Sequence, residues 1–138
     1  MIVLDTNIIS EIMSRTPSSN VVRWYSSIGA SQLATTVITV EEIEYGLGRL
    51  PEGRRRDGLI AAWSAVMEGF REQLLPLDVE SARVVARIRA EAERKGRPMS
   101  MADAQIAGIC MSRGDSLATR NVKDFDVVEG LEIVNPLE

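Results

Sequence analysis

Short hydrophobic runs alternate along the chain with longer segments in which apolar residues recur every three or four positions. The first run, residues 1–5, has four apolar residues closed by Asp5 and predicts a buried strand. Further short strands are predicted at residues 33–37, 74–78, 116–119 and 131–134. Pro76 cannot donate a ladder hydrogen bond, so the strand at 74–78 is expected at an edge or near its own end.

Helical periodicity fills the segments between these runs. Helices are predicted at residues 7–15, at 21–25 after a cap within 16–19, at 39–50, 59–70 and 81–95, and from Ser100 to a stop at Gly114. Strands that alternate with helices of this length indicate βαβ units and a parallel sheet covered on both faces. We therefore expect one α/β domain over residues 1–138 with a central, mainly parallel sheet.

The composition excludes several classes of site. The chain has no histidine and a single cysteine, so it cannot form an internal disulfide, a His/Cys zinc site, or a Ser-His or Cys-His catalytic pair. Cys110 lies in the apolar helical stretch Ala107-Gly-Ile-Cys-Met111, which favours a small core residue over a redox group.

The net charge and the kind of basic residue indicate which ligands the chain can bind. The net charge of −4 argues against a protein that coats nucleic acid non-specifically. The basic residues are nevertheless almost all arginine, the better bidentate ligand for phosphate, and three of them are consecutive at Arg54-Arg55-Arg56. Two interpretations of this cluster remain open: a ligand for phosphate or carboxylate, or a solvated loop whose arginines pair with Glu52 and Asp57.

The sequence also bears on location. The apolar runs are too short and too interrupted by charge for a transmembrane helix, and no basic region precedes an apolar stretch at the N-terminus. We therefore expect a cytoplasmic protein.

Acidic residues occur where strands end or helices begin. Asp5 ends the first strand, Asp103 lies in the first turn of a helix, Glu42 lies one turn into another helix, and Asp124 follows the strand at 116–119. Ligands of open α/β sheets bind beyond the carboxyl ends of the strands. Carboxylates gathered there would repel one another without a cation, so their convergence implies a hard metal such as Mg²⁺ or Mn²⁺. Each acid taken alone is equally compatible with a helix cap or dipole partner.

Three neighbouring glutamates, Glu41, Glu42 and Glu44, are candidates for one position in the acidic pocket. Glu42 lies beside the buried stripe of Val40, Ile43 and Leu47, where a carboxylate is partly buried and still reaches a cavity. Glu41 and Glu44 point about 100° and 200° away from it and suit solvent or a partner better.

Four segments carry a resemblance to a known family: Leu4-Asp5-Thr6-Asn7, Thr39-Val-Glu-Glu42-Ile-Glu-Tyr-Gly46, Met101-Ala-Asp103-Ala-Gln-Ile-Ala107 and Ala118-Thr-Arg-Asn121-Val-Lys-Asp124-Phe125. With these segments in this order and spacing, nearly the whole chain resembles the PIN domain. More narrowly, it resembles the VapC toxins of bacterial toxin–antitoxin pairs, and their FitB-like branch in particular. The resemblance implies a three-layer α/β/α fold and a Mg²⁺- or Mn²⁺-dependent endoribonuclease with an acidic pocket at one sheet edge.

The resemblance also assigns roles to residues. It implies that Asp5 and Asp103 are the core metal ligands, that Glu42 is the third acid, and that Thr6 and Asn7 are the polar residues after the first acid. Asn7 is expected to orient Asp5 or a metal-bound water.

The fourth acid of many relatives corresponds here to Asn121, a weaker ligand, with Asp124 three residues later. Asp124 either takes the fourth role or caps the turn that follows it, and both interpretations remain open.

The leading hypothesis for the chemistry is hydrolysis of RNA phosphodiester bonds by a metal-activated water, with Arg120 near the pocket binding the RNA backbone. A phosphatase or phosphotransfer domain is a rival, but the residue two positions after Asp5 is Asn7, where the phosphatase pair needs a second aspartate. The other rival is a catalytically weak PIN-like binding module that assembles with an antitoxin.

Partners follow partly from apolar residues near the N-terminus. Eight of them supply either a binding surface or plain core: Ile8, Ile9, Ile12, Met13, Val21, Val22, Trp24 and Tyr25. The resemblance implies a VapB/FitA-like antitoxin that wraps a helical surface and places a basic side chain in the acidic pocket. It also implies a homodimer that contacts DNA only through the antitoxin.

Overall fold

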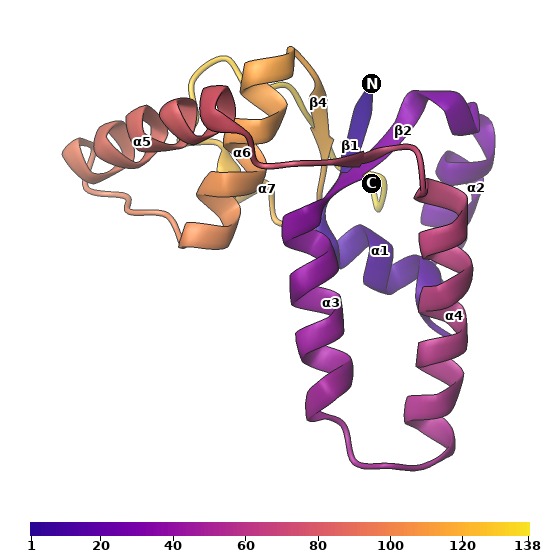
Figure 1. Cartoon of the computed structure of the whole chain (residues 1–138). Helices are drawn as coiled ribbons and strands as arrows, with labels where there is room; N and C mark the ends of the chain where they lie inside the picture. The colour runs from indigo at the N-terminus through magenta and orange to yellow at the C-terminus, as the bar shows by residue number, and fades with distance from the viewer.

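A central sheet of five parallel strands organises the chain. The computed structural model describes all 138 residues, and its strands are ordered β3-β2-β1-β4-β5 (Figure 1). They span Ile2–Leu4 (β1), Leu33–Thr36 (β2), Leu74–Leu75 (β3), Ser116–Ala118 (β4) and Ile133–Val134 (β5). β3 is an edge strand, as Pro76 predicts. The first strand of the sequence is therefore the middle strand of the sheet.

Alternation along the strands divides the core into two layers. Val3 and Leu117 face one side of the sheet, and Leu4 and Ala118 face the other. Their register is matched, because Val3 pairs with Leu117 and Leu4 with Ala118. Asp5 and Thr119, the next residue of each strand, consequently emerge beside each other at the carboxyl edge.

Helices cover both faces of the sheet, which confirms the predicted three-layer α/β/α fold. They span Thr6–Met13 (α1), Ser19–Ser27 (α2), Val37–Arg49 (α3), Arg54–Phe70 (α4), Val79–Arg94 (α5), Met101–Arg113 (α6) and Val122–Phe125 (α7). Helices α5, α6 and α7 pack on one face, while α1, α3 and α4 pack on the other. Figure 1 shows α3 and α4 as a pair of long helices that projects away from the sheet. No helix is long and apolar enough to cross a membrane.

Helices α5 and α6 approach each other closely at a glycine. A Cβ added to Gly108 would lie 2.3 Å from Val85 Cγ2 and 3.2 Å from backbone atoms of α5. Only a hydrogen fits in this space, so the side chain of residue 108 sets the separation of the two helices. Cys110, on the same helix, is fully buried in the core, and burial raises the pKa of its thiol to about 12, as expected for an inert core residue.

Most helix and strand boundaries differ from the predictions by one to five residues, and three of the differences have an identifiable structural cause. Helix α3 begins at Val37, because the Thr36 hydroxyl caps it by accepting from the backbone N–H of Thr39. Arg54-Arg55-Arg56 forms the first turn of α4, so the interpretation of this cluster as a solvated loop is wrong. The short helix α7 was not expected, because its four residues give no periodicity to detect.

Candidate acidic site

Asp5 is fixed at the carboxyl end of β1 by three hydrogen bonds. It caps α1, accepting from the backbone N–H of Thr6 at 2.8 Å through Oδ1. Its Oδ2 accepts from Asn7 Nδ2 at 3.0 Å and from Thr119 Oγ1 at 2.8 Å. The residue is only 4% exposed. Burial raises the pKa of its carboxyl and the charge of Glu42 raises it further, although the hydrogen bonds from Thr119, Thr6 and Asn7 oppose them.

Thr119 is a site residue that sequence reasoning missed. It is fully buried, and besides donating to Asp5 its hydroxyl accepts from Asn7 Nδ2 at 3.2 Å and from the backbone N–H of Asn121 at 3.0 Å. The available signal was positional, because Thr119 follows β4 just as Asp5 follows β1. A polar residue at the end of a central strand of a parallel sheet points toward the shared edge.

Asn7 connects the first strand to the loop after β4. Its amide nitrogen donates to Asp5 and Thr119, while its Oδ1 accepts from the backbone N–H of Arg120 at 3.0 Å. The structure therefore places Asn7 where it orients Asp5. The side chain of Arg120 is exposed beside this network.

Glu42 reaches the site through a chain of hydroxyl groups. Thr6 Oγ1 donates to Glu42 Oε1 at 2.7 Å and lies 3.0 Å from Thr39 Oγ1. Because Thr6 has only one hydroxyl proton, which Glu42 receives, Thr39 must be the donor to Thr6. Glu42 is half-buried, whereas Glu41 is exposed and Glu44 turns toward α4.

Asp103 approaches the same edge from the start of α6. Its backbone N–H donates to the Ser100 hydroxyl, which caps the helix at 3.2 Å. Partial burial raises the pKa of the Asp103 carboxyl to about 6, and the charges of Asp5, Asp124 and Glu42 act in the same direction. Four carboxylates from four segments are therefore close enough to interact.

Asp124 and Asn121, the two candidates for the fourth acidic position, lie differently relative to Asp103. Asp124 lines a cavity of about 480 Å³ together with Asp103, Ser100 and the basic residues Arg97 and Lys123. Its carboxylate accepts no hydrogen bond, so the structure gives no support to a role as a turn cap. Asn121 precedes α7 as its N-cap, is exposed, and does not line this cavity.

The donor set fits a hard divalent cation with an incomplete protein shell. All candidate donors are carboxylate oxygens, none of the four acids forms an ion pair with a basic residue, and the charge of Asp5 raises the pKa of Asp103. No group of three or more acidic side chains stands close enough to hold a metal ion directly. Mg²⁺ commonly uses one or two carboxylates and retains several waters, which is compatible with this spacing.

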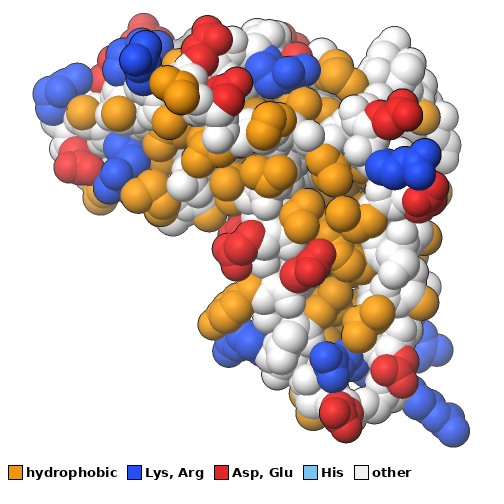
Figure 2. Space-filling view, viewed as in Figure 1, with side chains coloured by type: hydrophobic (Ala, Val, Ile, Leu, Met, Phe, Trp, Pro, Cys, Tyr) orange, Lys and Arg blue, Asp and Glu red, His pale blue; other side chains and the backbone are white.

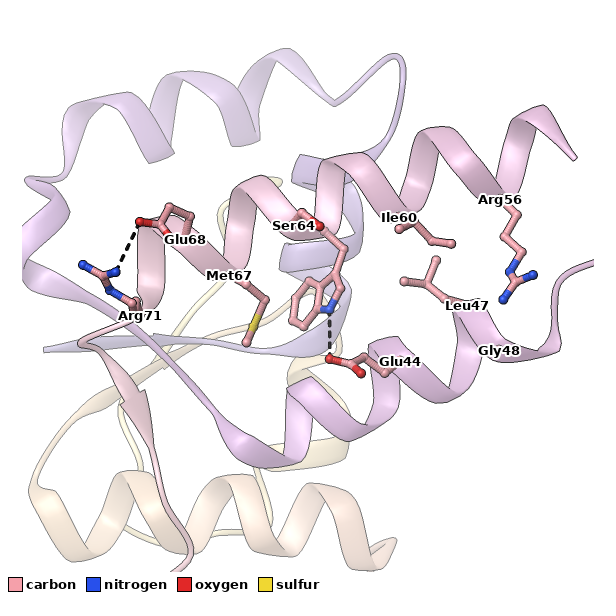
Figure 3. Close-up of a pocket in the computed structure, with 10 residues that line it drawn as sticks. Glu44, Leu47, Gly48, Arg56, Ile60, Ser64, Met67, Glu68 and Arg71 are labelled. Carbon is pink, nitrogen blue, oxygen red and sulfur yellow. Dashed lines mark hydrogen bonds and ion pairs between the residues drawn. The ribbon is translucent and has the colours of Figure 1, made fainter. Parts of the chain in front are cut away.

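A separate groove runs between α3 and α4. It has a volume of about 550 Å³ and is lined by apolar side chains such as Leu47, Ile60 and Met67, with Arg56 near one end and Arg71 at the other (Figure 3). Trp63 Nε1 donates to Glu44 Oε2 across it at 3.2 Å. The space-filling view shows hydrophobic side chains gathered between the two helices (Figure 2).

The apolar residues near the N-terminus belong mainly to the core. Ile8, Ile9, Met13 and Val21 are buried, and of the eight only Val22 is exposed. The remaining three, Ile12, Trp24 and Tyr25, are half-buried. Of the two interpretations left open, plain core applies to the four buried residues, while the other four keep exposed surface.

Comparisons with known proteins agree with this architecture. Residues 2–131 match the PIN domain family. The chain is 34% identical to the VapC ribonuclease Y4jK of Sinorhizobium fredii, with 100% of this chain and 99% of the relative covered. It is 31% identical to the toxin FitB of Neisseria gonorrhoeae, with 99% and 98% covered. It also superposes on the structure of FitAB bound to an IR36 DNA fragment with a TM-score of 0.92 and 30% identity, over 100% and 96% of the two chains.

Proposed function

Because the chain belongs to the PIN-domain family and within it to the VapC and FitB toxins, we propose that it is a magnesium-dependent endoribonuclease of a toxin–antitoxin pair. The observation that carries the proposal is the arrangement of Asp5, Glu42, Asp103 and Asp124 at one sheet edge without a basic partner. Such an uncompensated group of carboxylates suits a hard cation, with Mn²⁺ as a substitute for Mg²⁺. We expect the enzyme to act in the cytoplasm.

Asp5 and Asp103 would hold the cation, with Glu42 contributing through a bound water. When bound, a divalent cation supplies Lewis-acid polarisation of a phosphate oxygen and makes a nearby water more acidic. The protein contributes orientation. Thr119 and Asn7 fix the Asp5 carboxylate, and the Thr39–Thr6 hydroxyl chain fixes Glu42.

A proton acceptor is available without histidine. Without a cation the pKa of Asp103 is about 6, and a bound cation would favour its ionised form, so Asp103 serves as a ligand and the acceptor is a carboxylate that does not hold the metal. Asp124 is exposed in the adjoining cavity and is free to contact a water or a substrate hydroxyl. Lys123 lines the same cavity as Asp103 and Asp124, and Arg120 is exposed next to Asn7, so both would attract the phosphate backbone, whereas Arg97 of that cavity is paired with Asp126.

The test is cleavage of structured RNA by the purified chain. We expect cleavage with Mg²⁺, loss of cleavage in EDTA, and background activity for Asp5→Asn and Asp103→Asn, while the exposed control Glu41→Gln stays active. Equal cleavage by both variants in EDTA would refute the proposal. Metal-dependent thermal stabilisation without cleavage of varied RNAs would instead favour a binding module without turnover.

We also propose a VapB/FitA-like antitoxin as the partner, since one structural relative was solved as FitAB on DNA. The α3–α4 groove, with the side chains of Leu47, Ile60 and Met67, offers an apolar surface of the size that an amphipathic segment needs. DNA contact would then occur through the antitoxin, and the toxin is expected to form a homodimer. Co-expression with the adjoining reading frame and light scattering of the purified complex test both expectations.

A further inference from the structure

Three arginines meet in a cavity distinct from the acidic site. The cavity has a volume of about 840 Å³ and lies between the end of α1 and the start of α4. Its lining residues are Met13, Ser14, Arg15, Arg54, Arg55, Gly58 and Leu59. No acidic side chain lines it, although the chain as a whole is acidic. Figure 2 shows basic side chains at the free end of the α3–α4 pair, where α4 begins.

These arginines lack partners within the protein. Every ion pair of the chain involves other basic groups, namely the N-terminus, Arg71, Arg97 and Arg113. Glu52 and Asp57 are near in sequence, yet neither pairs with Arg54 or Arg55. Unpaired guanidinium groups that converge on one cavity without a carboxylate form a site for an external anion.

The start of α4 contributes further unpaired donors, with Asp57 as the one acidic residue of its first turn. Gly53 is its N-cap and offers no side-chain acceptor, so the first backbone N–H groups of a 17-residue helix have no cap at this end. On the other side of the same turn, Arg56 Nε is buried without a hydrogen-bond partner. The apolar side chains of Met13 and Leu59 complete the cavity and give a surface on which a ribose or base can pack.

Helix α1 connects this cavity to the acidic site. Asp5 caps the start of the helix, and Arg15 lies two residues beyond its end. An eight-residue helix is about 12 Å long. That length corresponds to a few nucleotides of a nucleic-acid strand.

We propose that the Arg15–Arg54–Arg55 cavity binds backbone phosphates of the RNA substrate a few nucleotides away from the bond that is cut. This inference rests on the proposed ribonuclease function and extends it to substrate positioning. Arginine–phosphate contacts act on any sequence, so the cavity sets affinity and register of the RNA and leaves base selection to other residues.

The test compares two triple variants of equal charge change. Arg15→Gln/Arg54→Gln/Arg55→Gln removes the cavity arginines, and Arg83→Gln/Arg87→Gln/Arg89→Gln removes three exposed arginines of α5 as the control. Each is combined with Asp103→Asn, and binding of fluorescein-labelled single-stranded RNA is followed by anisotropy over a salt series with Mg²⁺ present. Circular dichroism melts confirm that both triples fold.

We expect the cavity triple to bind RNA at least about tenfold more weakly at low salt, with the slope of log K against log salt reduced in magnitude by about 2, because each phosphate contact contributes about 0.7. The control triple should keep the parental slope. Unchanged affinity and slope in the cavity triple, while the parent chain cleaves RNA, would overturn this inference and leave the ribonuclease assignment intact.

Absence of both cleavage and RNA binding in the parent would refute the function and this inference together. Preferential binding of poly-glutamate over RNA that is lost only in the cavity triple would reassign the cavity to an acidic protein partner.

Discussion

The Thr119 hydroxyl donates a hydrogen bond of 2.8 Å to Asp5 Oδ2 across 114 positions of sequence. The bond is buried and fixes one oxygen of the central carboxylate. Thr119→Val keeps the shape of the side chain and removes the donor, so it should raise the pKa of Asp5 further and weaken metal-dependent RNA cleavage by about 10- to 100-fold.

Thr119→Ser provides the matched control because it retains the hydroxyl, and it should recover most of the cleavage. A shift in the Mg²⁺ concentration needed for half-maximal rate separates orientation of Asp5 from simple loss of folding. Equal Mg²⁺ requirements in the valine and serine variants would argue against this role.

Glu42 is expected to contribute to cleavage because Thr6 holds its carboxylate. Glu41 is exposed and is not expected to contribute. Glu42→Gln keeps the hydrogen bond from Thr6 and removes the charge, so cleavage should fall by at least about tenfold, while exposed Glu41→Gln should stay within about twofold of the parent. Single-turnover cleavage rates at saturating Mg²⁺ make the comparison. The prediction fails when Glu41→Gln is the more damaging change.

Asp103 should make the metal-free protein less stable as the pH rises. Its pKa is about 6 in the folded chain and near 3.8 when unfolded, so folding disfavours the ionised carboxylate. The contribution of Asp103 to folding stability is therefore fully present below about pH 4 and is lost as the pH rises through about 6. Asp103→Asn should flatten this dependence, with the remainder due to Asp5, whose pKa is raised in the same direction.

Melting temperatures in EDTA at about pH 5 and about pH 7.5 test this expectation, with exposed Glu93→Gln as the control. Adding Mg²⁺ at the higher pH should stabilise the parent more than Asp103→Asn, because bound cation favours the ionised acid. A parent chain that melts higher at neutral than at acidic pH, with no change in Asp103→Asn, would contradict the assignment.

Gly108→Ala should destabilise the protein, because the added methyl would overlap Val85 Cγ2 and press on the backbone of α5. Overpacking of this kind costs about 1 to 3 kcal/mol. Gly46→Ala is the matched control, since nothing lies within 4 Å of its added Cβ, and it should stabilise α3 by roughly 0.4 to 1 kcal/mol. Urea unfolding midpoints give both values, and similar signs for the two variants would disprove the close-contact argument.

Much of the fold followed from the sequence because its signals are local. A run of four apolar residues ended by Asp5 favours a buried strand by its shortness, and the Ser100 cap placed Asp103 in the first turn of its helix. The limits of α3 and α4 were misjudged, since Thr36 acts as a cap through a hydroxyl that also suits a strand, and the arginines at 54–56 have no apolar periodicity.

The site was harder to predict from the sequence because its residues come from segments that are far apart along the chain. The acids were recognisable from their position at element ends, but Thr119 gains its role only through the register that sets Leu4 beside Ala118. The choice between Asn121 and Asp124 likewise depends on α7, a helix of four residues that turns one side chain toward Asp103 and leaves the other outside the cavity. Pairing and orientation of this kind are fixed by tertiary packing.

The central place of β1 has a consequence for synthesis. The ribosome produces Asp5 among the first residues, but the strand that flanks it on one side, with Thr119, and the helix that presents Asp103 come from the last third of the chain. Contacts so distant in sequence form only when both partners exist. A chain that ends before Met101 therefore lacks half of the acidic site.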